Sequence, residues 1–270
     1  MTYHGGTVNG AAQYLKHHRQ REKKADNISV NSVKDIESAI NAIDEEISSL
    51  EAYPREELEK IIKEVGFRCT LCGRCCTKEY NDHVFLLTKD CRRAKEKYPD
   101  MIVPAPYFEI CDSEGHFYVS GYALKVKDNG DCAFLSKDRR CEIYGDRFEI
   151  CRIYPYMLHR EAGEYGNVDW RQISGLNDHG EYNSEISDEE CRKTAEMTTA
   201  YEKDFLVQER DFYKRVLKHL GENGLKPVRR IYDERMRAFG RGEPITVFVY
   251  NGDGFDERVV VSGDYTVKSD

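Results

Sequence analysis

The residues best suited to chemistry are cysteines, and four of them fall within the eight residues CTLCGRCC at positions 69–76. The first three are each separated by two residues and the fourth follows directly: Cys69, Cys72, Cys75 and Cys76. This spacing lets a tight loop aim successive thiolates at one metal ion or cluster, and Gly73 relieves crowding inside the loop. Because neighbouring side chains usually diverge, we expect Cys76 either to serve a second metal or to approach the first from the side.

The further ligands of such a site must come from elsewhere in the chain. The first run partly matches the bacterial ferredoxin pattern C-x2-C-x2-C-x3-C-P, but the fourth cysteine and its proline are missing at that offset. Three later cysteines recur at intervals of nine and ten residues, each beside apolar or aromatic residues: Cys132, Cys141 and Cys151. Seven of the ten cysteines thus form two sets, which favours a metal or iron-sulfur site over disulfides or inert core thiols.

Length and composition narrow the class of protein. A chain of 270 residues can bury a core without disulfides, and it shows neither an apolar signal region at its start nor an apolar run of the ~20 residues that span a membrane. We therefore expect a cytoplasmic protein that does not enter a membrane. A net charge of -8 argues against nucleic-acid binding. The basic run at 16–24 is either a contact for an acidic partner or a solvated tail.

Helices are expected before the cysteines. Ser32 and Asp35 form an N-cap signature, and apolar residues then recur at alternating intervals of three and four: Val33, Ile36, Ile40, Ile43, Ile47 and Leu50. A second helix should start after Pro54 and end at Gly66. The first apolar seam is only about two and a half heptads long, so packing within the chain and pairing with a partner both stay open.

The region that carries the cysteines, residues 67–175, has short apolar runs and turns. VFLLT at 84–88 predicts a strand that leads into a short helix before Pro99. A hairpin turning at Asn129 and Gly130 should bring Cys132 beside the first cysteine run.

Longer elements are expected towards the C-terminus. A long helix should begin at Asp188, capped by Ser187 and Glu190, and run to Gly221 across the cysteine-rich core. A helix over 227–240 and a terminal hairpin turning at 251–254 should follow.

These elements predict an α+β fold in which helices and a terminal β-hairpin flank a small cysteine-rich core of short strands and hairpins. We expect four segments: a flexible basic tail (1–26), a helical extension (27–66), a cysteine-cluster domain with its long helix (67–225), and a C-terminal helix with the hairpin (226–270).

Three stretches together resemble the YkgJ-like cysteine-cluster family, which is described as a zinc- or iron-chelating CxxCxxCC domain and often labelled as iron-sulfur oxidoreductases. They are FRCTLCGRCC at 67–76, LLTKDCRRA at 86–94 and CAFLSKDRRCEIYGDRFEICRIYPY at 132–156. The resemblance implies that the metal or cluster is bound by seven cysteines: Cys69, Cys72, Cys75, Cys76, Cys132, Cys141 and Cys151.

The chain departs from this family in two places. Phe148 follows Arg147 where family members usually have proline, and Ser174 stands where the family pattern ends in an eighth cysteine. Three other residues are candidates to replace that eighth ligand: Asp178, His179 and Cys191. His83, seven residues beyond Cys76, is a further candidate ligand or else an ordinary loop histidine.

The functional expectation is an iron-sulfur protein, with a 4Fe-4S cluster favoured, that passes electrons to a larger protein partner or helps to mature it. The sequence contains no nucleotide motif that would indicate another chemistry. Zinc suits four thiolates as well, so a zinc-binding adaptor is the first alternative. The family is also similar to flagellin lysine N-methylases, which makes a cluster-dependent protein lysine methyltransferase the second. The oligomeric state stays open.

Overall fold

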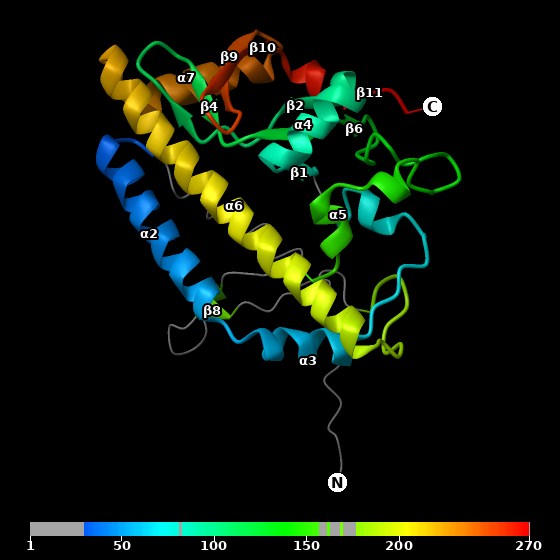
Figure 1. Cartoon of the computed structure of the whole chain (residues 1–270). Coiled ribbons are helices and arrows are strands. Elements are labelled where there is room, and N and C mark those ends of the chain that lie inside the picture. Colours follow the sequence, from blue (N-terminus) through cyan, green and yellow to red (C-terminus); the bar gives the residue numbers. More distant parts are fainter. Residues whose placement is uncertain (1–29, 81–82, 157–160, 163–167, 170–176, 270) are drawn as a thin grey trace.

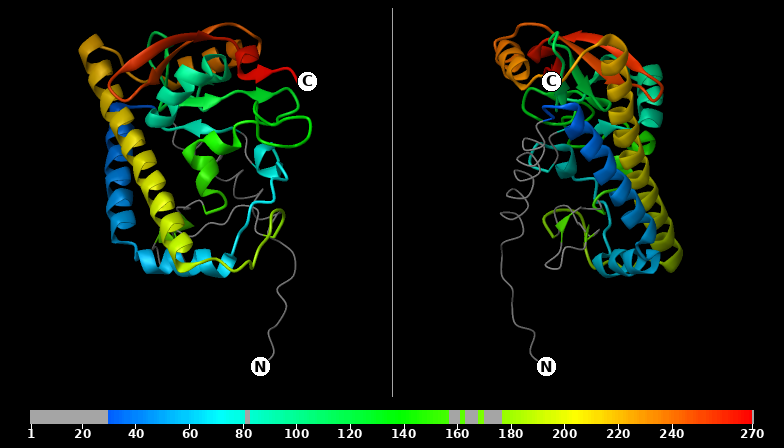
Figure 2. Two further views of the ribbon diagram at one scale, coloured as in Figure 1. Left: turned by 45° about the vertical axis from the view of Figure 1, so that its right-hand side comes forward. Right: turned by 90° about the vertical axis from the view of Figure 1, so that its left-hand side faces the viewer.

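The structure is a computed structural model, and it describes residues 30–80, 83–156, 161–162, 168–169 and 177–269. Two long helices run side by side along one flank, most of the β-strands gather at one end of them, and a shorter helix crosses the other end (Figures 1 and 2). Helices and strands in mixed sheets confirm the predicted α+β class. Within the described part of the chain, no helix combines the length and apolar character needed to cross a membrane.

Helix α2 (Val33–Ala52) has the predicted cap, because the Ser32 side chain accepts a hydrogen bond from the Asp35 backbone N–H at 3.3 Å. Four positions of its apolar seam are buried, Ile40 is half-buried, and Val33 at the first position is 42% exposed. The seam packs against helix α6 (Asp188–Asn223). Each fully buried aliphatic side chain contributes about 1.5–3 kcal/mol, so packing within the chain is the structural role of this seam.

Helix α3 (Arg55–Val65) leads directly into the cysteine run. Pro54 is its N-cap, and Gly66 ends it in the left-handed conformation at φ 51°. A side chain at Gly66 would also clash with the backbone carbonyl of Ser184, so glycine is required there on two counts. This helix packs against α6 near the start of that helix, which fixes where the cysteine run begins.

Helix α6 spans 36 residues and begins with the predicted cap, in which Ser187 Oγ accepts from the Glu190 backbone N–H at 3.2 Å. It ends at Asn223 rather than at Gly221. The helix continues through Gly221 without a steric conflict, and the residue that takes the left-handed conformation at its C-cap is Gly224. The helix packs against α2, α3 and α5 (Glu149–Ile153).

The strands form four small sheets. Their orders are β10-β9-β4-β3, β1-β5-β2, β11-β6 and β7-β8. The strands are β1 (Phe85–Leu86), β2 (Ile102–Pro104), β3 (Ile110–Cys111), β4 (Phe117–Val119), β5 (Tyr122–Leu124), β6 (Val126–Lys127), β7 (Glu161–Ala162), β8 (Val168–Asp169), β9 (Ile245–Tyr250), β10 (Phe255–Val260) and β11 (Thr266–Val267). The remaining helices are α4 (Thr88–Lys97) and α7 (Arg229–Gly240).

The terminal hairpin forms with the predicted turn, and Tyr250 pairs with Phe255 across it. Strand β9 also pairs in parallel with β4, so the hairpin shares a sheet with strands from the middle of the chain. This sheet thus joins segments from both sides of residue 226, where we expected one segment to end and the next to begin. That division of the chain stays a prediction.

The predicted hairpin at Asn129 and Gly130 is reduced to a tight turn. Gly130 has φ 84°, and its backbone N–H donates to the Lys127 carbonyl at 2.8 Å. The returning chain makes only an isolated bridge between Val126 and Cys132, and β6 pairs in parallel with β11.

Three cysteines outside the predicted ligand set belong to the apolar cores. Cys91 and Cys111 are buried in the core around the β-sheets, and Cys191 is buried in the core between α6 and the N-terminal helices. Two predictions, the basic run at 16–24 and Ser174, lie outside the described residues.

Candidate metal centre

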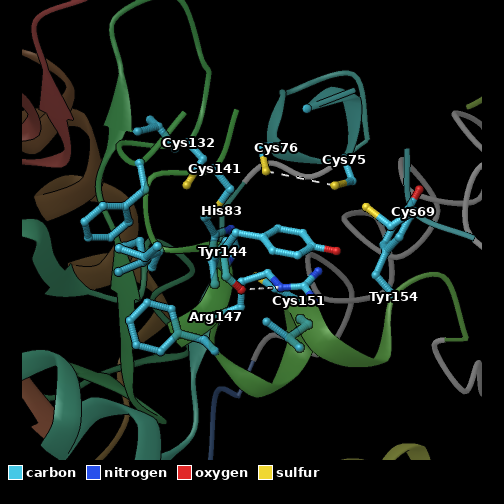
Figure 3. Close-up of a pocket in the computed structure, with 18 of the residues that line it drawn as sticks. Cys69, Cys75, Cys76, His83, Cys132, Cys141, Tyr144, Arg147, Cys151 and Tyr154 are labelled. Carbon is cyan, nitrogen blue, oxygen red and sulfur yellow. Dashed lines mark hydrogen bonds between the residues drawn. The ribbon is translucent and has the colours of Figure 1, made fainter. Parts of the chain in front are cut away.

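Six of the seven predicted cysteines line a single pocket, although they come from segments up to 82 positions apart (Figure 3). They are Cys69, Cys75, Cys76, Cys132, Cys141 and Cys151. Cys72, the seventh, is half-buried but is not among the residues that line the pocket. The long helix α6 contributes none of the described lining residues. It packs against α5, which carries Cys151, and the covering role expected for it stays a prediction.

Unusual backbone turns aim the first cysteine run into the pocket. Leu71 has φ 59° and Gly73 has φ 70°, and a 3-10 turn over Arg74–Cys76 follows. In this turn the Sγ atoms of Cys75 and Cys76 lie 3.9 Å apart and both side chains line the pocket. Adjacent cysteines diverge less here than in extended chain because the 3-10 turn curls the backbone around them. This geometry matches a sideways approach of Cys76 to one shared site.

Backbone contacts join the second cysteine set to the first. The Cys132 backbone N–H donates to the Cys76 carbonyl at 2.7 Å. Cys141 is held by an isolated bridge to Leu135, and a side chain at Gly73 would clash with Leu135 and with the Arg139 backbone. Cys151 is the third residue of α5. The two sets thus meet through a glycine contact and a direct backbone hydrogen bond.

Several thiols of the pocket resist ionisation while no metal is bound. Sulfur contact with Cys76 together with burial raises the pKa of Cys75, and burial raises the pKa of Cys132 to about 11. Burial and the neighbouring cysteines likewise raise the pKa of Cys151. Because metals bind thiolates, metal binding here must displace protons, and metal affinity should fall as the pH is lowered.

The donor set fits a thiolate-bound metal or cluster. Zinc takes four tetrahedral ligands of this kind and iron-sulfur clusters are held by cysteine thiolates. Within the described residues, no three metal-binding side chains already converge closely enough to hold an ion. The thiols therefore surround a common space and would have to rotate inwards around a bound metal.

None of the described candidates for an eighth ligand lies in the pocket lining. Asp178 is exposed, and its backbone carbonyl accepts a hydrogen bond from Arg74 at 2.8 Å. His179 is buried and its Nε2 lies 2.8 Å from the Tyr154 hydroxyl. Cys191 is buried in the helical core. His83 does line the pocket, where its ring packs against Tyr107 at 4.9 Å.

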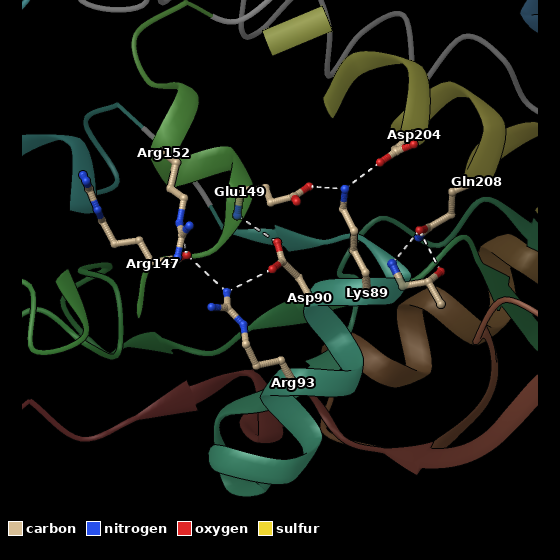
Figure 4. A network of polar contacts seen from close by, with 9 residues as sticks. Lys89, Asp90, Arg93, Arg147, Glu149, Arg152, Asp204 and Gln208 are labelled. Carbon is tan, nitrogen blue, oxygen red and sulfur yellow. Dashed lines mark hydrogen bonds and ion pairs between the residues drawn. The ribbon is translucent and has the colours of Figure 1, made fainter. Parts of the chain in front are cut away.

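Two residues that the sequence did not single out hold the second cysteine set in place (Figure 4). The Asp90 carboxylate, on α4, accepts a hydrogen bond from the Glu149 backbone N–H at 2.8 Å and so caps α5. Arg93 donates to Asp146 at 2.8 Å and to the Arg147 carbonyl at 3.1 Å. Asp90 and Arg93 of the stretch 86–94 thus form a clamp that holds the segment with the second cysteine set. The cysteine of this stretch, Cys91, is a core residue. The sequence did hold a signal for this role, because the family stretch 86–94 contains an acidic and a basic residue but no expected metal ligand.

The substitution of phenylalanine for proline at position 148 is compatible with this geometry. Phe148 has φ -69°, which is close to the angle that proline would fix. Its ring is buried and lies 4.9 Å below the Arg93 guanidinium, so it adds packing to the clamp.

Comparisons with known proteins agree with the cysteine pattern. Residues 68–174 match the family model CxxCxxCC, described as a "Putative zinc- or iron-chelating domain". The resemblance is confirmed for this segment, and the match supports metal binding by it. A protein of Methanocaldococcus jannaschii, named only as uncharacterized, is 28% identical over 102 residues, which cover 37% of this chain and 50% of the relative. The chain therefore spans about half the length of that relative. No solved structure matches.

Proposed function

We propose that the protein binds an iron-sulfur cluster, with 4Fe-4S favoured, and uses it to pass electrons to a larger protein partner or to help mature one. The observation that carries the proposal is the gathering of six thiols around one pocket, enough for the four that a 4Fe-4S cluster takes, with a first run that partly matches the ferredoxin spacing. A cluster bound there would supply one-electron chemistry, and the pocket cysteines would hold it.

The mouth of the pocket supports a protein partner. Cys69 is exposed, and two apolar side chains of the lining are also open to solvent: Leu71 is 38% exposed and Tyr144 is 37% exposed. Electron transfer and cluster delivery both require close approach of a partner surface, and exposed apolar side chains beside the centre favour such a contact. We place this function in the cytoplasm, where thiols stay reduced.

A zinc-binding adaptor is the second candidate. The favourable observation is that the cysteine segments contain little regular structure and rely on turns, isolated bridges and the clamp from α4. A structural zinc ion would add folding free energy to such a region.

Metal and sulfide analysis separates the two candidates. The protein would be purified without oxygen, and iron, zinc and acid-labile sulfide would be measured per chain, with visible spectra before and after dithionite. About four irons and four sulfides with a band that bleaches on reduction are expected for a 4Fe-4S cluster. Stoichiometric zinc without a visible band would overturn the iron-sulfur proposal in favour of the adaptor.

A further inference from the structure

The pocket has an uneven distribution of charge. Among its described lining residues, Lys125 and Arg147 carry a positive charge and none is an aspartate or glutamate. Four thiolates around a divalent ion leave a net charge of about -2, and a partly buried net charge is costly unless an opposite charge lies nearby. The lining is therefore suited to an anionic centre rather than to a bare cation.

Arg147 is the better placed of the two cations. Its guanidinium lies 3.8 Å from the centre of the Tyr144 ring, and its Nε donates to the Tyr144 carbonyl at 2.9 Å (Figure 3). Arg147 lines the same pocket as Cys141 and Cys151, which precede and follow it in the chain (Figure 3). The guanidinium therefore shares the pocket with two members of the second cysteine set.

The backbone on both sides of Arg147 is fixed by the clamp from α4 and by α5. Its carbonyl accepts hydrogen bonds from Arg93 at 3.1 Å and from Arg152 at 2.8 Å (Figure 4). The Asp146 carboxylate accepts a hydrogen bond from Arg93, and the Glu149 backbone N–H donates one to Asp90. A charge held in this way is already in position before a metal arrives, which is the condition for a large electrostatic effect.

We propose that Arg147 is a charge-balancing residue of the metal centre, whose guanidinium offsets the negative charge of the thiolates that hold the metal. This inference rests on the proposed metal-binding function and assigns a role to a residue that is not itself a ligand. A purely structural role is the competing explanation, in which the stack of Arg147 on Tyr144 only closes the 3-10 turn over Tyr144–Asp146.

Zinc affinity tests the proposal, because zinc binds the same thiolates without requiring sulfide or a redox partner. The full-length apo protein would be titrated with zinc ions against a chromophoric chelator at constant pH. The variants would be Arg147→Gln, Arg147→Lys and the control Arg140→Gln. Arg140 is exposed, lies in the same cysteine segment and is not part of the described pocket lining, so its replacement removes one charge without altering the pocket.

We expect Arg147→Gln to weaken zinc binding by about 10- to 100-fold, the range found when groups that support metal ligands are removed. Arg147→Lys should stay within a few-fold of wild type because it keeps the charge, and Arg140→Gln should match wild type. Equal affinity of Arg147→Gln and wild type would overturn the proposal. So would a loss in Arg147→Lys as large as in Arg147→Gln, since lysine cannot reproduce the planar stack and its failure would indicate a structural role.

Two further outcomes are decided by the same experiment. If Arg147→Gln does not fold, as judged by circular dichroism of the apo protein, Arg147→Lys decides alone: near-wild-type affinity supports the charge and a tenfold loss contradicts it. If wild-type protein binds neither zinc nor iron, metal binding itself fails and the role of Arg147 falls with it. A charge role that is wrong in a working metal centre would appear as tight binding by both wild type and Arg147→Gln.

Discussion

The helical frame and the cysteine pocket are built on different principles. The frame consists of α2, α3 and α6, whose apolar faces form one continuous buried cluster. The pocket is made of turns, two 3-10 helices and a five-residue helix, and it is held by single backbone hydrogen bonds and a clamp from α4. Burial of apolar surface stabilises the frame without any ligand, whereas a bound metal would add direct links between the thiols of the pocket.

The largest expected effect comes from breaking the frame. Phe212 on α6 is fully buried, and its ring packs near Tyr213, Tyr250 and Phe255. Replacing Phe212 with alanine should lower the free energy of unfolding by about 3–5 kcal/mol, because it leaves a cavity in addition to the lost burial. Urea unfolding of the apo protein would measure this, with Lys214→Ala on the exposed face of the same helix as the control. A loss below ~1 kcal/mol would contradict the assignment of this core.

A matched pair of cysteine variants should separate the pocket from an apolar core. Cys151 lines the pocket, whereas Cys91 is buried in the core beside the sheets. We expect Cys151→Ser to lose most of its bound metal, since a hydroxyl is a much poorer ligand than a thiolate. Cys91→Ser should keep its metal and lose roughly 1–3 kcal/mol of stability by burying a hydroxyl. Metal content and thermal unfolding of both proteins check this, and the reverse pattern would place the metal elsewhere.

The clamp joins α4 to the segment that carries the second cysteine set, so damage to it should lower both stability and metal affinity by smaller amounts. Asp90→Ala removes the cap of α5 and a partner of Arg93, which should cost about 1–2 kcal/mol of stability. Zinc affinity should fall about tenfold as the second cysteine set loosens.

Lys89→Ala is the control for the clamp, because its ion pairs with Glu149 and Asp204 are partly exposed and should contribute less than about 1 kcal/mol. Chelator competition and urea unfolding of both variants give the two numbers. An unchanged zinc affinity in Asp90→Ala would disprove the positioning role.

The smallest effect concerns pH and the sheet end of the molecule. Burial opposes ionisation of Asp256, but hydrogen bonds from Lys95, Tyr122 and Asn251 outweigh it and lower its pKa to about 2. An aspartate with a lowered folded-state pKa stabilises the protein above its unfolded-state pKa of about 3.9, and this contribution is lost as the pH falls towards 2. Asp256→Asn should therefore lose roughly 1–2 kcal/mol at pH 7 and show a flatter decline between pH 4 and 2. Unfolding curves at several pH values test this.

Much of the frame could be predicted from the sequence because local signals determine it. The cap at Ser32, the left-handed glycine at Gly66 and the apolar seam of α2 act over a few residues, and each appears as expected. The end of α6 was misplaced by two residues, because Gly221 and Gly224 are both glycines and only the second takes the left-handed conformation.

The pocket was predictable in its members but less so in its support. The cysteine spacing and the family resemblance indicated seven thiols, of which all but Cys72 line the pocket, yet the clamp depends on Asp90 and Arg93 meeting a segment more than 50 positions away. Such a long-range polar contact leaves no periodic trace in the sequence. The pairing of β9 with β4 was missed for the same reason, since nothing local specifies which distant strand a hairpin will join.

Amide hydrogen exchange of the apo and metal-loaded protein tests the central claim most directly. The account predicts that metal slows exchange in the segments 69–76 and 132–151, which carry the pocket cysteines, and leaves α2 and α6 at their apo protection. Unchanged exchange in both cysteine segments on metal loading, or new protection confined to the helical frame, would contradict a metal centre in this pocket.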